Sequence, residues 1–329
     1  NYWLFVFFEA LPEKLVDEKY YSYFIGFISD DSDKKISHST FRTLRVLDKF
    51  RIVHPEVYVD VSRVIINKRK YSDFIVCIYF EVLFYKDNYM PSELLMLYKS
   101  DINTLKKIYF YMLEKGKFVD LEGEFLVKFI ETDESFLESY NDYFWKTKNM
   151  HEYEYQIFAL WKSDSYEKYW DYIFYHRPSN NDEFYWENAS VFGKALVHTE
   201  DNIMIVERQK NWILHIIEDN ADNHNIYSIF YIICDLSEEI RKNAIEKFLS
   251  CNCDYSVFEK ISIEPTLWSW SGSEISLINR RIHFLKSLLP YMNELKLLSH
   301  KSLIKSRILA LEKRIKAAEI DDLCRSLYM

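Results

Sequence analysis

Apolar residues recur at intervals of three and four along most of the chain, which is the pattern of amphipathic helices that bury one face. The clearest unit is the segment 101–116. Asp101 is a natural N-cap residue and Gly116 a natural C-terminal stop. The apolar residues between them that share one face are Ile102, Leu105, Ile108, Tyr109 and Met112. This segment predicts a helix with both of its ends marked.

Three further segments repeat this pattern. A helix is predicted over 133–148, with the apolar face Phe136, Leu137, Tyr140, Tyr143 and Phe144. Another is predicted over 164–176, with Tyr166, Tyr169, Trp170, Ile173 and Phe174. In the third, Asp235 and Glu238 form a capping-box pattern ahead of Ile240, Ala244, Ile245 and Phe248. Their lengths are those of ordinary globular helices.

The chain closes with a predicted pair of helices. Ser271, Gly272 and Ser273 do not form the G-x-S-x-G nucleophile pattern, and no strand precedes them. Ser273 instead stands where an N-cap is expected, before a helix with the apolar face Ile275, Ile278, Ile282, Leu285 and Leu289. Its predicted partner runs over 300–319, with Ile304, Ile308, Leu311 and Ile315 facing it. We expect Trp268 and Trp270 to close the end of the helical array; the alternative is that one of them stays exposed as a binding anchor.

Strand signals are few. Residues 56–62 alternate apolar and polar side chains and allow a short strand. Residues 74–84 are rich in β-branched and aromatic residues, but no Gly or Pro hairpin signal flanks them, so we expect a buried helix there.

The expected fold is therefore all-α. Helices of this length joined by short polar connections predict an irregular α-solenoid of HEAT/TPR-like helical pairs that ends in a long helical hairpin. No strict repeat period supports a tetratricopeptide or ankyrin consensus, and a compact irregular bundle is the alternative. We expect an N-terminal helical array over 1–150 and a C-terminal array over 151–329 with the hairpin as its cap, and a hinge at 146–151 or in the polar loop 177–183.

Composition supports this picture and narrows the function classes. Only 5 Gly and 6 Pro occur, against 24 Phe, 26 Tyr and 8 Trp, which disfavours turn-rich β folds and glycine-rich phosphate loops. The net charge of -9 argues against general nucleic-acid binding. A local basic strip is expected to be a solvated helix face and comprises Lys301, Lys305, Arg307, Lys313, Arg314 and Lys316.

The N-terminal stretch and the cysteines both indicate a cytoplasmic protein. The opening apolar stretch is too short to cross a bilayer and lacks the basic start of a secretion signal. The five cysteines have no disulfide or zinc spacing, so we expect reduced thiols in the cytoplasm and no membrane association. The first residue is Asn1, and we treat the chain as a C-terminal piece of a larger protein.

Catalytic signatures are missing from the sequence. Gly116 and Gly193 each precede a lysine but lack the other residues of a P-loop, and no His pair has zinc-ligand spacing. The acidic run 30–33 lacks the glycine and the bidentate glutamate of a calcium loop. Carboxylates near helix starts, such as Asp120, Glu122, Glu124 and the group 131–134, serve capping and the helix dipole most simply. We expect no catalytic residue, metal or cofactor in this chain.

The aromatic-rich middle is the main candidate for binding. Trp161 and Tyr172 belong to it, and its aromatic residues exceed what one helix buries on a single stripe. Exposed Tyr and Trp side chains anchor protein partners well. The candidate partner-binding residues are Tyr166, Tyr169, Trp170, Tyr175, Tyr185 and Trp186. A buried core built from the same residues remains the open alternative.

The last third carries a resemblance. The runs 238–241, 248–249, 258–261 and 268–273 and the two closing helices resemble the C-terminal helical-repeat sensor arms of bacterial antiviral STAND NTPases. The resemblance implies an upstream effector and nucleotide-binding oligomerisation module, and a C-terminal array that binds a phage protein and triggers assembly. This chain has no P-loop, so only the sensor role carries over, and no particular residue with it.

Three functions follow from the sequence. The first is a non-catalytic sensor arm that binds a protein partner, with oligomerisation through upstream domains of the same polypeptide. The second is a structural or oligomerisation scaffold without a foreign ligand. The third is a helical enzyme with a pocket of carboxylates, which requires at least two carboxylates with perturbed pKa values in one enclosed site.

Overall fold

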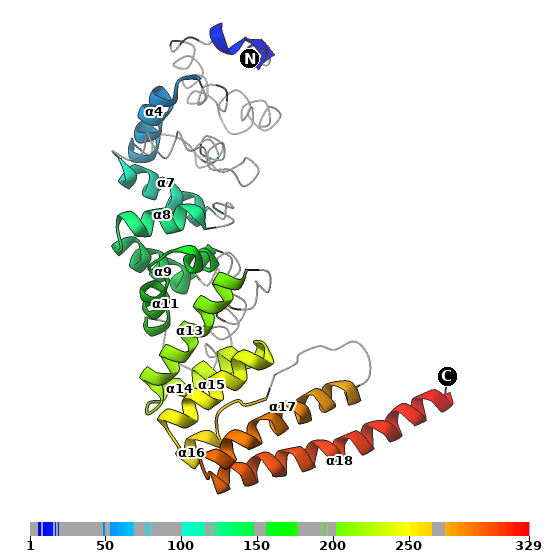
Figure 1. Ribbon diagram of the computed structural model, residues 1–329. Coiled ribbons are helices and arrows are strands. Elements are labelled where there is room, and N and C mark those ends of the chain that lie inside the picture. Colours follow the sequence, from blue (N-terminus) through cyan, green and yellow to red (C-terminus); the bar gives the residue numbers. More distant parts are fainter. Residues whose placement is uncertain are drawn as a thin grey trace. The chain divides into compact units, whose positions relative to one another are not determined.

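The regular secondary structure of the residues that the structure describes is helical. The computed structural model describes residues 6, 7, 9–15, 17, 19, 49, 53–68, 77, 80, 101–115, 120, 123–147, 156–176, 192, 196, 202–264 and 274–328. Within these residues there are eleven α-helices, three short 3-10 helices and no strand (Figure 1). The expected all-α class is confirmed.

The chain divides into two compact units, Asn1–Glu138 and Ser139–Met329. The division falls inside helix α9, whereas the sequence placed the boundary after residue 150. The alternative hinge at 177–183 lies outside the described residues. The helices of the first part of the chain are η1 (Glu13–Leu15), α4 (Pro55–Lys68), α7 (Ile102–Glu114), α8 (Glu124–Thr132) and α9 (Ser135–Thr147).

Helix α7 forms as its sequence predicts. Asp101 is its N-cap, and the Asp101 side chain accepts a hydrogen bond from the amide of Thr104. That bond satisfies one of the backbone N–H groups that a helix start leaves without a partner. The predicted apolar face is the buried face, since Leu105, Ile108 and Tyr109 are all almost inaccessible.

The possible strand at 56–62 is wrong, because these residues lie in α4. Val59, Ser62 and Ile65 are buried at a spacing of three residues, which is a helical face and not the two-residue period of a strand. In the segment 74–84, Cys77 and Phe80 are described, and both are helical and buried, as a buried helix requires.

The second unit contains the longer helices. Its elements are the second part of α9, η2 (Ala159–Lys162), α11 (Tyr166–Tyr175), α13 (Ile203–Asn220), α14 (Asn225–Ile232), η3 (Ile233–Asp235), α15 (Glu238–Cys251), α16 (Tyr255–Phe258), α17 (Glu274–Glu294) and α18 (Leu298–Tyr328). Packed pairs such as α11 with α13, α13 with α15, and α17 with α18 join elements that are close in sequence.

The start of α15 differs from the prediction. The N-cap is Ser237, whose hydroxyl accepts a hydrogen bond from the Ile240 amide at 3.4 Å, whereas the sequence suggested a capping box led by Asp235. Asp235 lies in the preceding 3-10 helix η3. Serine and aspartate are comparably good N-cap residues. Because Asp235 is already part of η3, the helix begins two residues later, after Ser237.

Helices α17 and α18 form the predicted closing hairpin and lie side by side (Figure 1). Their shared core contains Ile278, Ile282 and Leu285 from α17 and Ile304, Ile308 and Leu311 from α18. Helix α17 begins at Glu274, the residue after the predicted cap Ser273. The residues 265–273, with Ser271, Gly272, Ser273, Trp268 and Trp270, lie outside the described part of the chain.

The hairpin core predicts a matched pair of stability effects. Leu285 is fully buried, whereas Leu309 of α18 is 58% exposed. We expect Leu285→Ala to lower the free energy of unfolding by about 2–5 kcal/mol, because it removes buried apolar atoms and leaves a cavity. The same chemical change at Leu309 is expected to stay within about 0.5 kcal/mol. Denaturant unfolding of both variants tests this, and equal losses would contradict the packing of the hairpin.

Candidate interaction surface on helices α11 and α13

The aromatic middle of the chain forms a buried core. The indoles of Trp161 and Trp170 stack with a centroid distance of 4.3 Å and an interplanar angle of 14°. Trp212 of α13 lies at 5.8 Å from each of them. All three are at most 2% exposed. This cluster ties η2 and α11 to α13.

The predicted partner-binding residues therefore have different positions. Tyr169 and Trp170 are buried, so they belong to the core and not to an accessible surface. A single helix stripe does not hold all the aromatic residues of α11, but α11 packs against both η2 and α13, which widens its buried face. Tyr185 and Trp186 lie outside the described residues.

Two of the predicted residues reach the surface. Tyr166 is half-buried, and the guanidinium of Arg208 lies 5.0 Å from the centroid of its ring, a cation–π contact. Burial raises the pKa of the Tyr166 hydroxyl. Tyr175, at the other end of α11, is 46% exposed. Tyr166 is the first residue of α11 and Tyr175 is the last.

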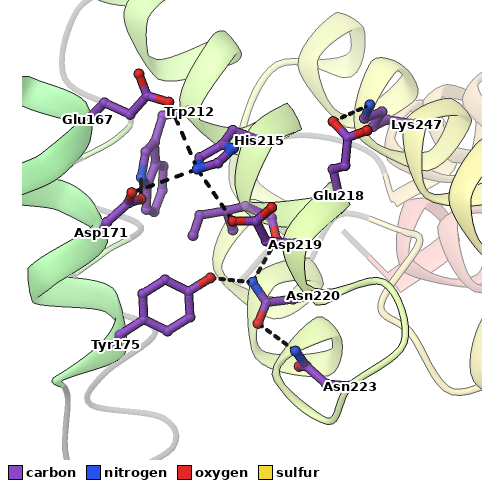
Figure 2. A network of polar contacts seen from close by, with 11 residues as sticks. Glu167, Asp171, Tyr175, Trp212, His215, Glu218, Asp219, Asn220, Asn223 and Lys247 are labelled. Carbon is purple, nitrogen blue, oxygen red and sulfur yellow. Dashed lines mark hydrogen bonds and ion pairs between the residues drawn. The ribbon is translucent and has the colours of Figure 1, made fainter.

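An acidic cluster centred on one histidine lies between α11 and α13 (Figure 2). His215 Nε2 is 3.5 Å from Asp219 Oδ2, 3.7 Å from Asp171 Oδ2 and 3.9 Å from Glu167 Oε1. Glu167 and Asp171 come from α11, and His215 and Asp219 from α13. The side chains of all four are between 29% and 54% exposed, so the cluster faces solvent.

Buried groups hold this cluster in place. Asp171 Oδ1 accepts a hydrogen bond of 2.9 Å from the indole N–H of Trp212. One carboxylate oxygen of Asp171 therefore faces the tryptophan core and the other faces His215. The geometry of the acidic cluster is thus coupled to the packing beneath it.

An asparagine network fixes the Tyr175 end of the same face. Asn220 Nδ2 donates to the Tyr175 hydroxyl at 2.9 Å and to the backbone oxygen of Ile216 at 2.8 Å. Asn220 Oδ1 accepts from the side-chain amides of Asn223 and Asn225. Asn220 is buried, so these bonds satisfy a side-chain amide whose burial without partners would cost free energy of folding. Tyr175 consequently exposes part of its aromatic ring while Asn220 holds its hydroxyl in place.

Ion pairs tie the neighbouring helices to α13. Arg208 donates to the backbone oxygens of Trp161 and Ser163 at 2.8 and 2.7 Å and to Asp164. Lys247 Nζ of α15 lies 2.6 Å from Glu218 Oε2 of α13. The hydrogen bond between them lowers the pKa of the Glu218 carboxyl and raises that of the Lys247 ammonium. These contacts anchor α13 on both sides of the acidic cluster.

We call the group Glu167, Asp171, Tyr175, His215 and Asp219 the α11–α13 face. Of this group, the sequence singled out only Tyr175 as a candidate for binding. A usable signal was present, since Glu167 and Asp171, and His215 and Asp219, are each four residues apart and so share one side of their helices. That two such pairs face each other follows only from the packing of α11 on α13.

The described residues contain no group of three or more His, Cys, Asp or Glu side chains arranged to hold a metal ion. No disulfide joins Cys77, Cys234, Cys251 or Cys253, of which the first two are buried and the last two exposed. None of the described helices has an apolar stretch of the length that a bilayer crossing needs. The expectation of no cofactor stays a prediction. The acidic run 30–33 lies outside the described residues.

Among the described carboxylates, Asp120 has the most perturbed titration. Burial raises the pKa of its carboxyl to about 6, although hydrogen bonds from the amides of Phe125 and Leu126 and from the Tyr109 hydroxyl oppose the shift. Those amides belong to the first turn of α8, where an anion is stabilised. Among the described residues, the neighbours that hold Asp120 are thus those of a helix cap, and none of them contributes a second carboxylate.

No protein-family profile, no curated protein and no solved structure matches the chain. The resemblance to the sensor arms of STAND NTPases accordingly gains no support from these comparisons and stays a hypothesis.

Asp120 generates a prediction on pH. Its pKa is about 6 when folded and about 3.9 when unfolded, so between these values the folded protein binds more protons there. The contribution of Asp120 to stability is therefore present at pH 4 and is lost as the pH rises through 6, by up to about 3 kcal/mol. In Asp120→Asn this part of the pH dependence should vanish.

Hydrogen exchange of the α8 amides between pH 4.5 and 7, corrected for intrinsic exchange rates, measures this difference. The two proteins should diverge as the pH rises, with the wild type losing more protection. Parallel pH profiles would show that Asp120 is not held as a buried carboxyl.

Proposed function

We propose that this chain is a non-catalytic protein-recognition module that binds its partner through the α11–α13 face. The main support is an exposed set of carboxylates around His215. The hydrogen bond from Trp212 to Asp171 anchors this set to the buried core. A surface held in one geometry loses little conformational freedom on binding. Tyr175, exposed and hydrogen-bonded, supplies an aromatic anchor beside the charges.

The charge of this face indicates the kind of partner. Three carboxylates gather around one imidazole, which suits a partner segment that carries Lys or Arg side chains. Such complementarity accelerates encounter and selects against acidic partners. We therefore propose a basic segment of a protein as the occupant of this face.

The wider proposal is an α-solenoid sensor arm of a bacterial antiviral STAND NTPase, with a phage protein as partner and upstream domains that supply nucleotide binding and assembly. Its support is the all-α structure, the packing of helices that are close in sequence, and the closing hairpin. The cytoplasm is the proposed location, since a phage protein is met there.

A charge-reversal experiment tests the recognition role. Cells that carry the full-length protein are challenged with a panel of phages, and protection is measured as plating efficiency. Glu167→Lys combined with Asp219→Lys should reduce protection at least tenfold, because both side chains are half exposed and now repel a basic segment. Circular dichroism of the purified chain checks that the fold is kept.

The matched control is Glu114→Lys combined with Glu138→Lys, two exposed glutamates outside the α11–α13 face. It makes the same change in net charge and should leave protection intact. Protection that survives the change on α11 and α13, or that is lost equally in the control, contradicts the proposal.

A scaffold without a foreign ligand is the second candidate, and the burial of Tyr169 and Trp170 in the protein's own core favours it. A scaffold is expected to self-associate through its surface with no added protein. Sedimentation of the purified chain separates the two, since a recognition module should stay monomeric when no partner is added.

A further inference from the structure

Helix α18 has a second patterned side, opposite to the side that packs on α17. Leu298, Leu309 and Ile320 are 78%, 58% and 61% exposed, respectively. They follow one another at a spacing of eleven residues, which is three helical turns, so they lie almost on a straight line along the helix. Neighbouring members are about 16 Å apart along the axis.

Lysines share this line. Lys305, Lys313 and Lys316 project within about 60° of the three aliphatic residues when α18 is viewed along its axis, and all three are exposed. In contrast, the buried residues Ile304, Ile308 and Leu311 project to the opposite side, towards α17. We call Leu298, Lys305, Leu309, Lys313, Lys316 and Ile320 the α18 stripe.

The three lysines of the stripe are not engaged in ion pairs within the described structure. None of the three forms an ion pair with another described residue, whereas Arg314 contacts Glu274, Arg307 contacts Glu264, and Glu312 contacts Lys286 of α17. Glu312, four residues before Lys316, has its carboxylate at Lys286 of α17. The stripe therefore combines exposed apolar side chains with unneutralised positive charge.

The setting of this charge is unusual for the chain. The whole chain has a net charge of -9, but basic residues outnumber acidic ones from Glu274 to the end. A positive surface on an otherwise acidic protein attracts anionic partners at long range.

We propose that the α18 stripe docks an acidic amphipathic helix of a protein partner. This inference rests on the proposed recognition function and adds a second surface to it. An eleven-residue apolar spacing matches another helix that runs nearly parallel to α18, because such a helix repeats its own face at the same interval. Carboxylates beside its apolar line reach the three lysines, and a charge pattern of this kind selects partner and orientation.

Other occupants fit the stripe less well. A second copy of α18 would bring lysines against lysines, which is repulsive. Helices that lie on anionic membranes bury a broad apolar face, whereas this apolar line is one side chain wide and contains lysines. Nucleic acid would use the lysines but leave the three aliphatic residues without a role.

The test uses a synthetic helical peptide of about 25 residues, long enough to cover the stripe. Leucines are placed at eleven-residue intervals and glutamates at the positions that face the lysines. Binding to the full chain is measured by fluorescence anisotropy at low and high salt. A peptide with lysine in place of each glutamate, vesicles with anionic lipid, and a 20-base-pair DNA duplex are measured alongside.

We expect the acidic peptide to bind, to weaken at high salt, and to lose at least tenfold in affinity with Leu309→Glu and with the triple variant Lys305→Glu, Lys313→Glu, Lys316→Glu. The matched controls change exposed residues elsewhere: Leu15→Glu, and the triple variant Lys146→Glu, Lys162→Glu, Lys260→Glu. Both controls should bind the peptide as the wild type does.

The proposal is overturned if the acidic peptide does not bind, if the lysine peptide binds equally well, or if the stripe variants bind like the controls. Binding of only the vesicles or only the DNA overturns it in favour of those partners. The peptide assay changes α18 and the phage assay changes α11 and α13. Failure of the stripe is therefore distinguishable from failure of the proposed function.

Discussion

The stacked indoles of Trp161 and Trp170, closed by Trp212, are the contact on which the packing of η2, α11 and α13 is built. Aromatic pairs contribute about 0.5–1.5 kcal/mol beyond the area they bury, and each tryptophan also excludes a large area from water. The indole N–H of Trp170 is buried and has no hydrogen-bond partner among the described residues, which costs about 1–3 kcal/mol. The ring stays buried nonetheless, so its packing outweighs that cost.

The same cluster sets the geometry of the surface above it. Trp212 packs on the other two indoles and also donates to Asp171, so the position of one carboxylate of the acidic cluster is set by a buried ring. Arg208 reinforces this by holding the backbone oxygens of Trp161 and Ser163. A loss of packing in the core would therefore displace the exposed charges, although none of the buried rings faces a partner.

The sequence predicts much of the helical framework, because helix starts and buried faces are local properties. Asp101 and the apolar spacing after it are sufficient to place α7. The failures have the opposite cause. The face predicted over 164–176 already groups Tyr169 and Trp170 with Ile173 and Phe174, and all four are buried. Assigning Tyr169 and Trp170 to a partner surface is wrong because η2 and α13 both pack on α11, and the pattern of one helix does not show how many neighbours cover it. The alternation at 56–62 misleads because a short window suits both a strand and a helix.

The two exposed surfaces of the second unit have opposite charge and different construction. The α11–α13 face gathers carboxylates from two helices, so it exists only when α11 and α13 are packed. The α18 stripe lies on a single helix, so its pattern is already complete in the sequence and needs only the helix and the packing of its other side on α17. This difference explains why the stripe, with its eleven-residue spacing, is recognisable from the sequence once the buried side of α18 is known. The acidic cluster becomes visible only in three dimensions, because its two halves are more than forty residues apart along the chain.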